Sequence, residues 1–387
     1  MKRLILFFVC FGAASQRSVA QSARDLFDDS TLHEIRLSVK AEDWQTLKDR
    51  YLEDIHFPAD LAWRDVTVRN ISIRSRGWGS RNAQKPGLKV DFDWYQSGQR
   101  FLGLNNLILD NAWQDPTFLR EPLSMKLFRR LQIAAPRESF ARLYVNGEYS
   151  GLYLIVEDID RDFLRNAFGE VEGFLYDKVR SENFYFEYLG DNPGAYVPAL
   201  FEAKTHEDNP EAGVLRDMIR AMNQSPDSQF VQQAWRYFDV NRLLQYLAVE
   251  NYIAEWDGFA GDFGNNNYSL YRFEGLEHFA LIPWDKDLAF TVPALDVQHN
   301  FDTNVLTRRL MQSGFRPAYF QALQRTVTAA GFLSTEMERL RALIHQAAIE
   351  DPVKPVDNDK FAAEIDALRY FVANRSDFVL RAIGQSF

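Results

Sequence analysis

The chain has 387 residues, of which 46% are hydrophobic and 25% are charged. This is the composition of a folded globular protein, which excludes disordered, collagen-like and low-complexity architectures. With 44 basic and 54 acidic residues the formal net charge is −10. We expect no nucleic-acid partner, because phosphate backbones bind basic surfaces. The length fits two or three domains, or one bilobal enzyme.

The N-terminus predicts a secretory signal peptide over residues 1–20. Lys2 and Arg3 precede a short apolar run, and small residues then lead to a cleavage site after Ala20. The run is shorter than the ~20 residues that span a bilayer, so we expect no stable membrane insertion. The only cysteine, Cys10, lies in this segment. The mature chain is then an exported protein without disulfides, either secreted, periplasmic or at the cell surface, and loss of three basic residues moves its charge from −10 to −13.

The first part of the mature chain is predicted to be rich in strands. A strand begins at residues 32–37, residues 41–51 look helical, and a β stretch over 66–74 follows. Residues 76–81, Arg-Gly-Trp-Gly-Ser-Arg, contain too much glycine for a strand interior and predict a turn. An alternating strand over residues 88–93 comes next and carries a lysine on its polar face.

A helix is predicted to start at Asp115 and Pro116, an N-cap and a first-turn proline. Leucines four residues apart, from Leu119 to Leu131, give it a buried stripe, and Glu121 lies off that stripe.

The second half of the chain is predicted to be mainly helical. A hairpin over residues 140–156 precedes it, helices fill most of 211–256, and a polar loop over 257–267 leads to a second hairpin at 268–282. Helices occupy most of 303–383. We expect an α+β protein of two lobes.

Several catalytic classes are excluded by what the chain lacks. Its six histidines show no pair at helical zinc-ligand spacing, and no G-x-S-x-G segment marks a serine hydrolase. Two acidic clusters remain, Asp257 beside several asparagines, and Asp285 with Asp287. A glycosidase that uses Asp257 and Asp285 is one interpretation, but it leaves the glycine turn and the strand lysine without roles.

Phosphoryl transfer accounts for more of these residues. It needs a glycine loop, a strand lysine, a helix glutamate, a carboxylate near the acceptor hydroxyl, and an asparagine and an aspartate for metal. The chain offers these in kinase order: Gly77 and Gly79, Lys89, Glu121, Asp257, Asn266 or Asn267, and Asp285. Carboxylate and amide oxygens suit Mg²⁺ or Mn²⁺. Each residue also has a structural interpretation, such as a tight turn, a solvated lysine or a helix cap.

Eight segments resemble the spore coat protein H (CotH) kinase family, a match that spans roughly residues 32–290. They are residues 76–80, 85–92, 99–104, 119–123, 144–153, 246–250, 256–258 and 282–288. The resemblance implies a secreted, atypical protein-kinase-like fold, with an N-lobe over residues 21–158 and a C-lobe with a helical extension over 159–387. It also implies that the protein uses ATP and a divalent metal to phosphorylate serine or threonine of proteins.

The resemblance also implies roles for single residues. The loop residues Gly77, Gly79 and Ser80 would bind the nucleotide, Lys89 its phosphates, and Glu121 would hold Lys89. Asp257 would be catalytic, and Asn266 and Asp285 would bind metal.

One departure concerns the loop after Asp257. Residues 260–264 lengthen it, and Asp262 stands five positions before Asn267, which is the spacing between base and metal asparagine in protein kinases. We favour Asp257 as the base because it keeps the Trp-Asp-Gly context and an insertion can bulge away from the site.

The adenine site is predicted from aromatic residues near the lobe boundary. Tyr153 and Phe279 would supply flat apolar walls, and Glu157, where the first lobe ends, would make the hinge contact. A rival interpretation of the whole chain is a non-catalytic surface or matrix protein that keeps the fold as an interaction module, since ATP is scarce outside the cytoplasm.

Overall fold

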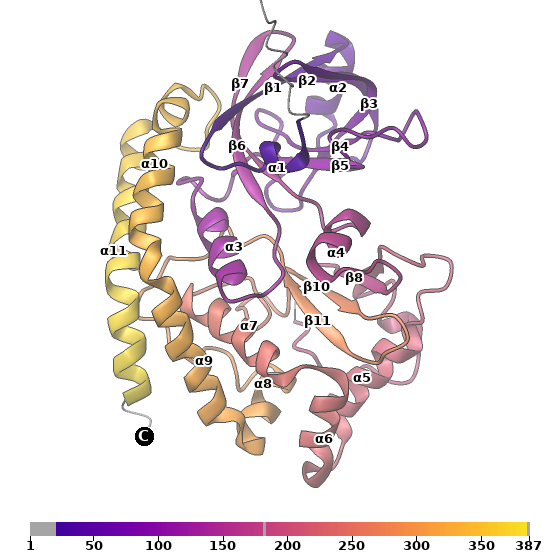
Figure 1. Ribbon diagram of the computed structural model, residues 1–387, viewed down its shortest axis with the longest axis vertical. Helices are drawn as coiled ribbons and strands as arrows, with labels where there is room; N and C mark the ends of the chain where they lie inside the picture. Colours follow the sequence, from indigo (N-terminus) through magenta and orange to yellow (C-terminus); the bar gives the residue numbers. More distant parts are fainter. Residues whose placement is uncertain (1–20, 181–182, 385–387) are drawn as a thin grey trace, which may run out of the picture.

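The computed structural model describes residues 21–180 and 183–384. The expected signal peptide, residues 1–20, lies outside the described residues. Figure 1 shows a strand-rich lobe above a mainly helical lobe, with the C-terminal helices along one side. The expected α+β fold class is therefore confirmed.

The N-lobe is a closed barrel of seven strands in the order β1-β2-β3-β4-β5-β7-β6. The parallel pair β1–β6 closes it, and the other neighbours are antiparallel. Alternation of apolar and polar residues directs one face of each strand inward, as in β1, where every second residue is buried. The elements are α1 (Ala23–Leu26), β1 (Leu32–Val39), α2 (Ala41–Asp49), β2 (Phe57–Trp63), β3 (Val66–Arg76), β4 (Gly87–Asp91), β5 (Asn106–Asp110), β6 (Glu138–Val145) and β7 (Glu148–Val156).

Helix α3 (Arg120–Arg130) starts later than the sequence predicts. Instead of capping a helix at Pro116, the Asp115 carboxylate accepts hydrogen bonds from the backbone N–H groups of Thr117, at 2.9 Å, and of Arg120, at 2.8 Å. Phe118 has a left-handed backbone, with φ of 61°, so a continuous helix cannot pass through it. Asp115 therefore closes a turn, and Glu121 lies in the first helical turn.

The C-lobe combines a four-stranded antiparallel sheet, in the order β11-β10-β8-β9, with helices packed around it. Its strands are β8 (Phe174–Lys178), β9 (Phe201–Ala203), β10 (Tyr268–Arg272) and β11 (Phe279–Pro283). Its helices are α4 (Arg161–Phe168), α5 (Ala212–Gln224), α6 (Asp227–Tyr237), α7 (Val240–Tyr252), α8 (Val305–Leu310), α9 (Arg316–Ala329), α10 (Leu333–Glu350) and α11 (Asn358–Gly384), with short helical turns η1 (Pro193–Ala195), η2 (Met311–Phe315) and η3 (Ala330–Phe332). Both predicted hairpins are present.

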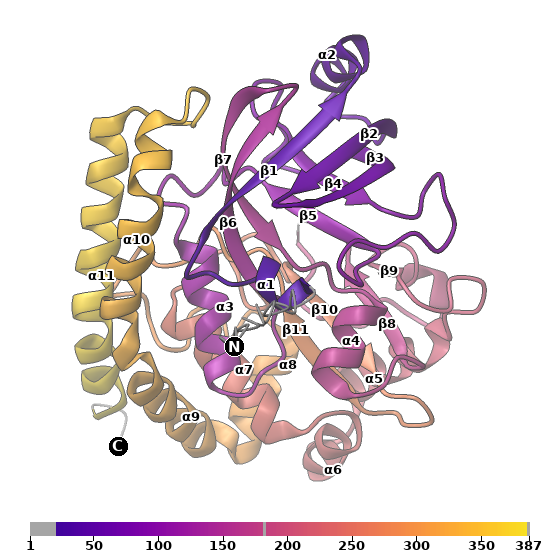
Figure 2. The same ribbon diagram turned by 45° about the horizontal axis from the view of Figure 1, so that its top comes forward.

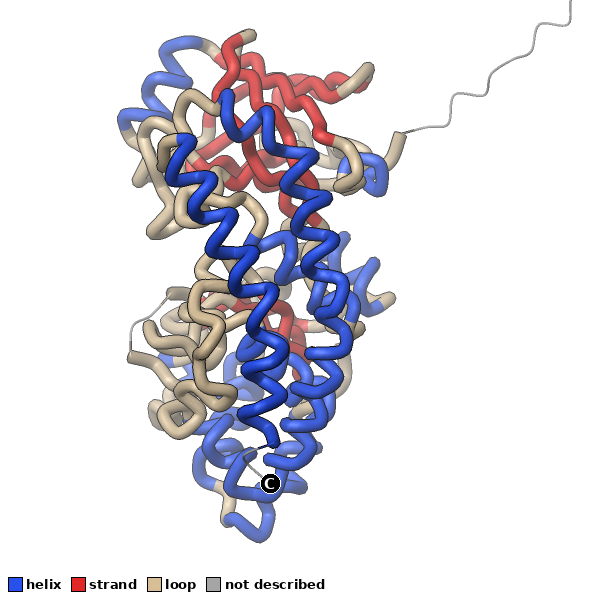
Figure 3. The backbone as a smooth tube through the Cα atoms, turned by 90° about the vertical axis from the view of Figure 1, so that its left-hand side faces the viewer, coloured by secondary structure: helices blue, strands red, loops and turns tan. Residues whose placement is uncertain are grey.

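Helices α10 and α11 run side by side along the molecule and reach the barrel (Figures 2 and 3). Where α10 ends, Asp351 forms an ion pair of 2.8 Å with Lys85, and neither side chain is exposed. The Asp351 carboxylate also accepts the backbone N–H of Leu152 at 3.0 Å. Gly151, with φ of 113°, leaves room for it, since a Cβ there would lie 2.7 Å from an Asp351 oxygen. The helical pair thus fixes the N-lobe onto the C-lobe.

Within the described residues, no helix is both long and apolar enough to cross a membrane.

Candidate active site between the lobes

A cleft of about 540 Å³ separates the barrel from the C-lobe sheet. Its N-lobe wall comes from the glycine turn after β3 and from β4, and its C-lobe wall comes from β8, β9, β10 and the segment after β11. Most of the predicted site residues line it: Gly77, Gly79, Ser80, Lys89, Asp257 and Asp285. Residues that lie up to 208 positions apart in the sequence are thus brought together.

Hydrogen bonds from neighbouring side chains fix the backbone of the glycine turn. Gly77 has φ of 108°, a conformation that side chains rarely adopt, and its carbonyl accepts a hydrogen bond of 2.7 Å from Arg81. The carbonyl of Ser80 accepts a hydrogen bond of 2.9 Å from Asn111. A Cβ at Gly79 would lie 3.2 Å from the amide oxygen of Gln114. Gly77 therefore provides the backbone conformation of the turn, and Gly79 leaves room for the side chain of Gln114.

Lys89 extends from β4 into the cleft, where its ammonium contacts Asp158 at 2.9 Å. Burial lowers the pKa of Lys89, but the carboxylate of Asp158 outweighs that effect and holds the pKa above its ordinary value. Among the described residues, Lys89 makes no ion pair or hydrogen bond with Glu121, its predicted partner. Glu121 is buried behind the cleft, and burial, together with Glu138 and Asp285, raises its pKa well above the ordinary value.

Asp257 follows α7 in a tightly folded loop. One of its carboxylate oxygens accepts a hydrogen bond of 3.1 Å from Asn266, and the other forms an ion pair with Arg180. The loop can close only because Gly261 has no side chain, since a Cβ there would lie 2.5 Å from the carbonyl of Trp256. Asp257 therefore presents a fixed and fully partnered carboxylate at the floor of the cleft.

Asp262, the alternative base, points elsewhere. Its carboxylate contacts His299 at 2.6 Å and Asn300 at 2.5 Å, and it is not among the described residues that line the cleft. The expected bulge away from the site is therefore wrong for the loop as a whole: a Cβ at Gly261 would lie 3.0 Å from the Cα of Asp257, and Phe263 lines the cleft, so only the Asp262 side chain is directed elsewhere.

The two asparagines differ in position. Asn266 is 1% exposed and lies behind Asp257, where its amide also donates to the carbonyl of Phe263 at 3.0 Å. Asn267 lines the cleft. The order of residues leaves both asparagines open and the resemblance favours Asn266 as the metal ligand, but of the two only Asn267 lines the cleft.

Asp285 and Asp287 both line the cleft directly after β11. Burial raises the pKa of Asp285, reinforced by Asp110 and opposed by Arg76, and burial with repulsion from Asp285 raises the pKa of Asp287 well above its ordinary value. Lys286 between them is buried, with its ammonium 2.7 Å from Glu250. The two aspartates thus form a carboxylate cluster short of positive charge.

The donor set suits a hard divalent cation, but it does not enclose one. Within residues 21–180 and 183–384, no three His, Cys, Asp or Glu side chains are grouped closely enough to hold a metal ion. Mg²⁺ is commonly held by one or two protein carboxylates together with substrate phosphates and water. Asp285 and Asp287 fit that arrangement.

The three residues predicted to bind adenine lie outside the cleft. Tyr153 is fully buried in the barrel, where its hydroxyl donates to the carbonyl of Pro86 at 3.0 Å. Glu157 forms an ion pair of 2.6 Å with Arg137. Phe279 lines a different pocket. Alternation along a strand indicates which residues are buried, but it does not indicate which cavity they face.

The structure adds cleft residues that the sequence pattern did not single out: Arg76, Asp158, Lys178, Arg180 and Lys204. Burial lowers the pKa of Lys178 to about 8, an effect that Asp257 opposes. Arg76 could have been noticed because it adjoins the glycine turn. Arg180 and Asp158 carry no such sequence pattern.

The family described as CotH kinase protein matches residues 73–379. This chain belongs to the CotH kinase family. Inner spore coat protein H of Bacillus subtilis is 27% identical over 365 residues, covering 91% of this chain and 98% of that protein. Invasin CotH3 of Rhizopus delemar is 22% identical over 320 residues and covers 73% of this chain. The chain spans about half the length of that invasin, 52%.

Two solved structures are similar at a low level. The HipA–HipB–operator DNA complex of Shewanella oneidensis is 14% identical in sequence, with a TM-score of 0.38 over 77% of this chain and 65% of the other. The proinflammatory kinase CtkA of Helicobacter pylori is 10% identical, with a TM-score of 0.37 over 78% and 95%. These TM-scores are low, and the assignment of a kinase-like protein rests on the family match.

Proposed function

We propose that this chain is an exported protein kinase that transfers the γ-phosphoryl group of ATP to serine or threonine of secreted or cell-surface proteins. The observation that carries the proposal is that Lys89, Asp257, Asp285 and the glycine turn line one cleft. A non-catalytic scaffold has no need for all of these in one place. A glycosidase with Asp257 and Asp285 as its acids leaves Lys89 and the glycine turn unused.

Each residue has a chemical role in this proposal. The N–H groups of the glycine turn, together with Lys89 and Arg76, compensate the charge of the phosphates. Asp285 and Asp287 are the groups that would hold Mg²⁺ or Mn²⁺, which when bound neutralises phosphate charge. Asp257 orients the acceptor hydroxyl and accepts its proton. Arg180 must release Asp257 before that proton can be accepted.

The location outside the cytoplasm is supported by the predicted signal peptide and by the names of the relatives. Inner spore coat protein H and Invasin CotH3 are named for a spore coat and for invasion. The proposed partners are ATP and a protein acceptor, with no nucleic acid, because the chain is acidic.

One observation favours a second candidate, an interaction module without catalysis. Arg180 and Asn266 occupy both carboxylate oxygens of Asp257 in this structure. If that arrangement is permanent, Asp257 cannot accept a proton.

The test is incubation of the purified protein with γ-labelled ATP, Mg²⁺ or Mn²⁺, and candidate acceptor proteins, including the chain itself. The parent is expected to label serine or threonine. Asp285→Ala is expected to keep the fold but lose divalent-dependent ATP binding, because the triphosphate charge is then uncompensated. Equal Mg·ATP affinity of variant and parent in calorimetry would exclude Asp285 as a metal ligand. Absence of labelling by the parent under all conditions would favour the interaction module.

A further inference from the structure

A second cavity, of about 570 Å³, lies in the C-lobe and shares no lining residue with the cleft. Four elements form it: the end of α3, the end of α4, the start of α7, and the β10–β11 hairpin. This volume is within the range of small-molecule pockets, roughly 300–1,000 Å³. We call it the back pocket.

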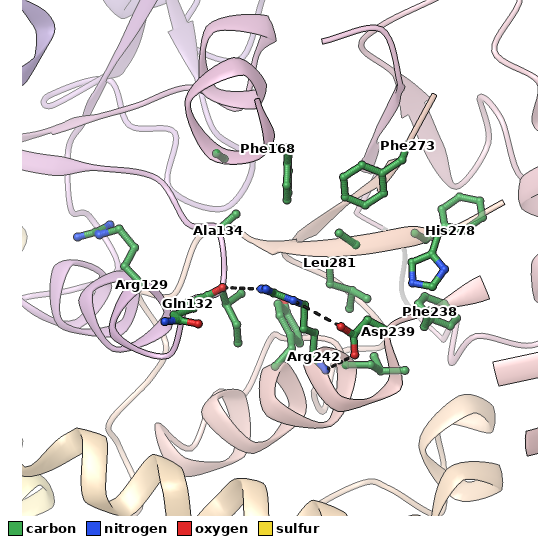
Figure 4. Close-up of a pocket in the computed structure, with 16 residues that line it drawn as sticks. Arg129, Gln132, Ala134, Phe168, Phe238, Asp239, Arg242, Phe273, His278 and Leu281 are labelled. Carbon is green, nitrogen blue, oxygen red and sulfur yellow. Dashed lines mark hydrogen bonds and ion pairs between the residues drawn. The ribbon is translucent and has the colours of Figure 1, made fainter. Parts of the chain in front are cut away.

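Aromatic rings make up much of its wall. Phe168 and Phe273 contact each other edge to face, with centroids 5.3 Å apart, and Figure 4 shows them on one side of the pocket. Leu281 and Arg242 lie on the opposite side (Figure 4). An aromatic ligand fits between such walls, because aromatic rings bury a large apolar area against one another.

Two charged groups face the back pocket, the guanidinium of Arg242 and the carboxylate of Asp239. Arg129 also lines it, but Figure 4 shows its guanidinium directed away from the pocket. That carboxylate is already engaged as the N-cap of α7, where it accepts the backbone N–H of Arg242 at 3.2 Å. Of the two, the exposed Arg242 guanidinium is therefore more available to a ligand, which favours an anionic group over a cationic one.

Arg242 is the group best placed to bind that anion. Its guanidinium donates to the carbonyl of Gln132 at 2.8 Å, and its Nε forms an ion pair with Asp239 at 3.6 Å, a distance too long for a hydrogen bond. A guanidinium has five N–H donors in a fork that matches a carboxylate or sulfonate. The side chain is 66% exposed, so its remaining donors are accessible.

We propose that the back pocket binds a small aromatic monoanion, with its ring between Phe168, Phe273 and Leu281 and its acidic group on Arg242. A nucleoside triphosphate does not suit this pocket, because Arg129 donates to the carbonyl of Pro136 and only Arg242 remains for a charge of several units.

The experiment is a fluorescence titration of the full chain with anilinonaphthalene sulfonate, an aromatic monoanion that becomes fluorescent in apolar surroundings. One saturable site per chain is expected, and a neutral aromatic amine of the same size is expected to bind more weakly. Arg242→Glu is expected to weaken probe binding by at least about tenfold, because a charge-assisted hydrogen bond is lost and a repulsion is gained. Ala167→Trp is also expected to weaken it, since Ala167 is an exposed position on the pocket rim and a large ring there fills the space.

Two variants serve as controls. Arg381→Glu changes an exposed arginine on α11 by the same charge, and it is expected to bind the probe like the parent. Lys89→Ala alters the cleft and is also expected to leave probe binding unchanged. The proposal is overturned if the parent shows no saturable site, if either Arg242→Glu or Ala167→Trp binds the probe like the parent, or if Lys89→Ala loses the probe.

Discussion

Two lysines of the N-lobe form ion pairs of nearly the same length in different surroundings. Lys85 and Asp351 are 2.8 Å apart with neither side chain exposed, whereas Lys89 and Asp158 are 2.9 Å apart and 23% and 20% exposed. The rings of Phe118 and Tyr153 also cover the Lys85 ammonium. The first pair joins two distant parts of the chain, and the second faces the cleft.

The difference shows how burial separates a structural ion pair from a functional one. If one ion of a fully buried pair left, the other would remain as an unpaired charge in a medium of low polarity. The Lys85–Asp351 pair is therefore a permanent structural contact. Lys89 borders open space and can exchange Asp158 for the phosphate of a ligand. The length of an ion pair alone does not distinguish the two cases.

The largest expected effect comes from breaking the buried Lys85–Asp351 ion pair. Asp351→Ala leaves Lys85 buried without a counter-ion, and we expect it to lower the free energy of unfolding by about 3–5 kcal/mol. Urea denaturation followed by circular dichroism measures this. Asp158→Ala is the matched control at the partly exposed pair, where water reaches Lys89, so the expected loss is smaller than that of Asp351→Ala. Equal losses in the two variants would contradict the distinction.

The next effect concerns the partly exposed Lys89–Asp158 pair, and it appears in nucleotide binding rather than in stability. Lys89→Ala is expected to weaken Mg·ATP binding by roughly 10- to 100-fold, which corresponds to one charge-assisted hydrogen bond. The urea midpoint should stay close to that of the parent, because the strand keeps its buried face. Calorimetry measures the affinity, and an unchanged value would make Lys89 an ordinary edge lysine.

Glu138 is a buried carboxyl group, and it extends the comparison to pH dependence. Its carboxyl oxygens have no hydrogen-bond partner among the described residues, and burial raises its pKa to about 8. The folded chain therefore holds a proton that the unfolded chain releases near the ordinary pKa of 4.5, so this contribution to stability falls as pH rises from about 4.5 through about 8.

Glu138→Gln is expected to reduce that loss, because an amide has no proton to release in this range. The measurement is the urea midpoint of parent and variant at about pH 5 and about pH 9. The parent should lose more stability between these values than the variant. Identical pH dependence would mean that Glu138 is not the group responsible.

The sequence predicted local structure better than long-range contacts. Hairpins and the glycine turn follow from short patterns, and Lys89, Asp257 and Asp285 follow from their order along the chain. The Lys85–Asp351 pair joins residues 266 positions apart, and no local pattern connects them. Arg180 was missed for the same reason.

Two local predictions failed for identifiable physical reasons. The α3 start moved because Asp115 closes a turn at a left-handed Phe118, a competing use of the same capping side chain. The adenine prediction chose rings by their place near the lobe boundary, but Tyr153 is buried in the barrel core. Which cavity a buried ring faces depends on the packing of several elements.

The most direct test of the central claim compares Asp257→Asn with Asp262→Asn in phosphoryl transfer at saturating ATP, so that weak binding is not mistaken for slow chemistry. The account predicts that Asp257→Asn still binds Mg·ATP but transfers phosphate ~10²–10⁴-fold more slowly, because an amide cannot accept the hydroxyl proton. Asp262→Asn should transfer at nearly the parent rate, because its carboxylate faces His299 and not the cleft. An inactive Asp262→Asn beside a nearly unchanged Asp257→Asn would contradict the account and identify Asp262 as the base.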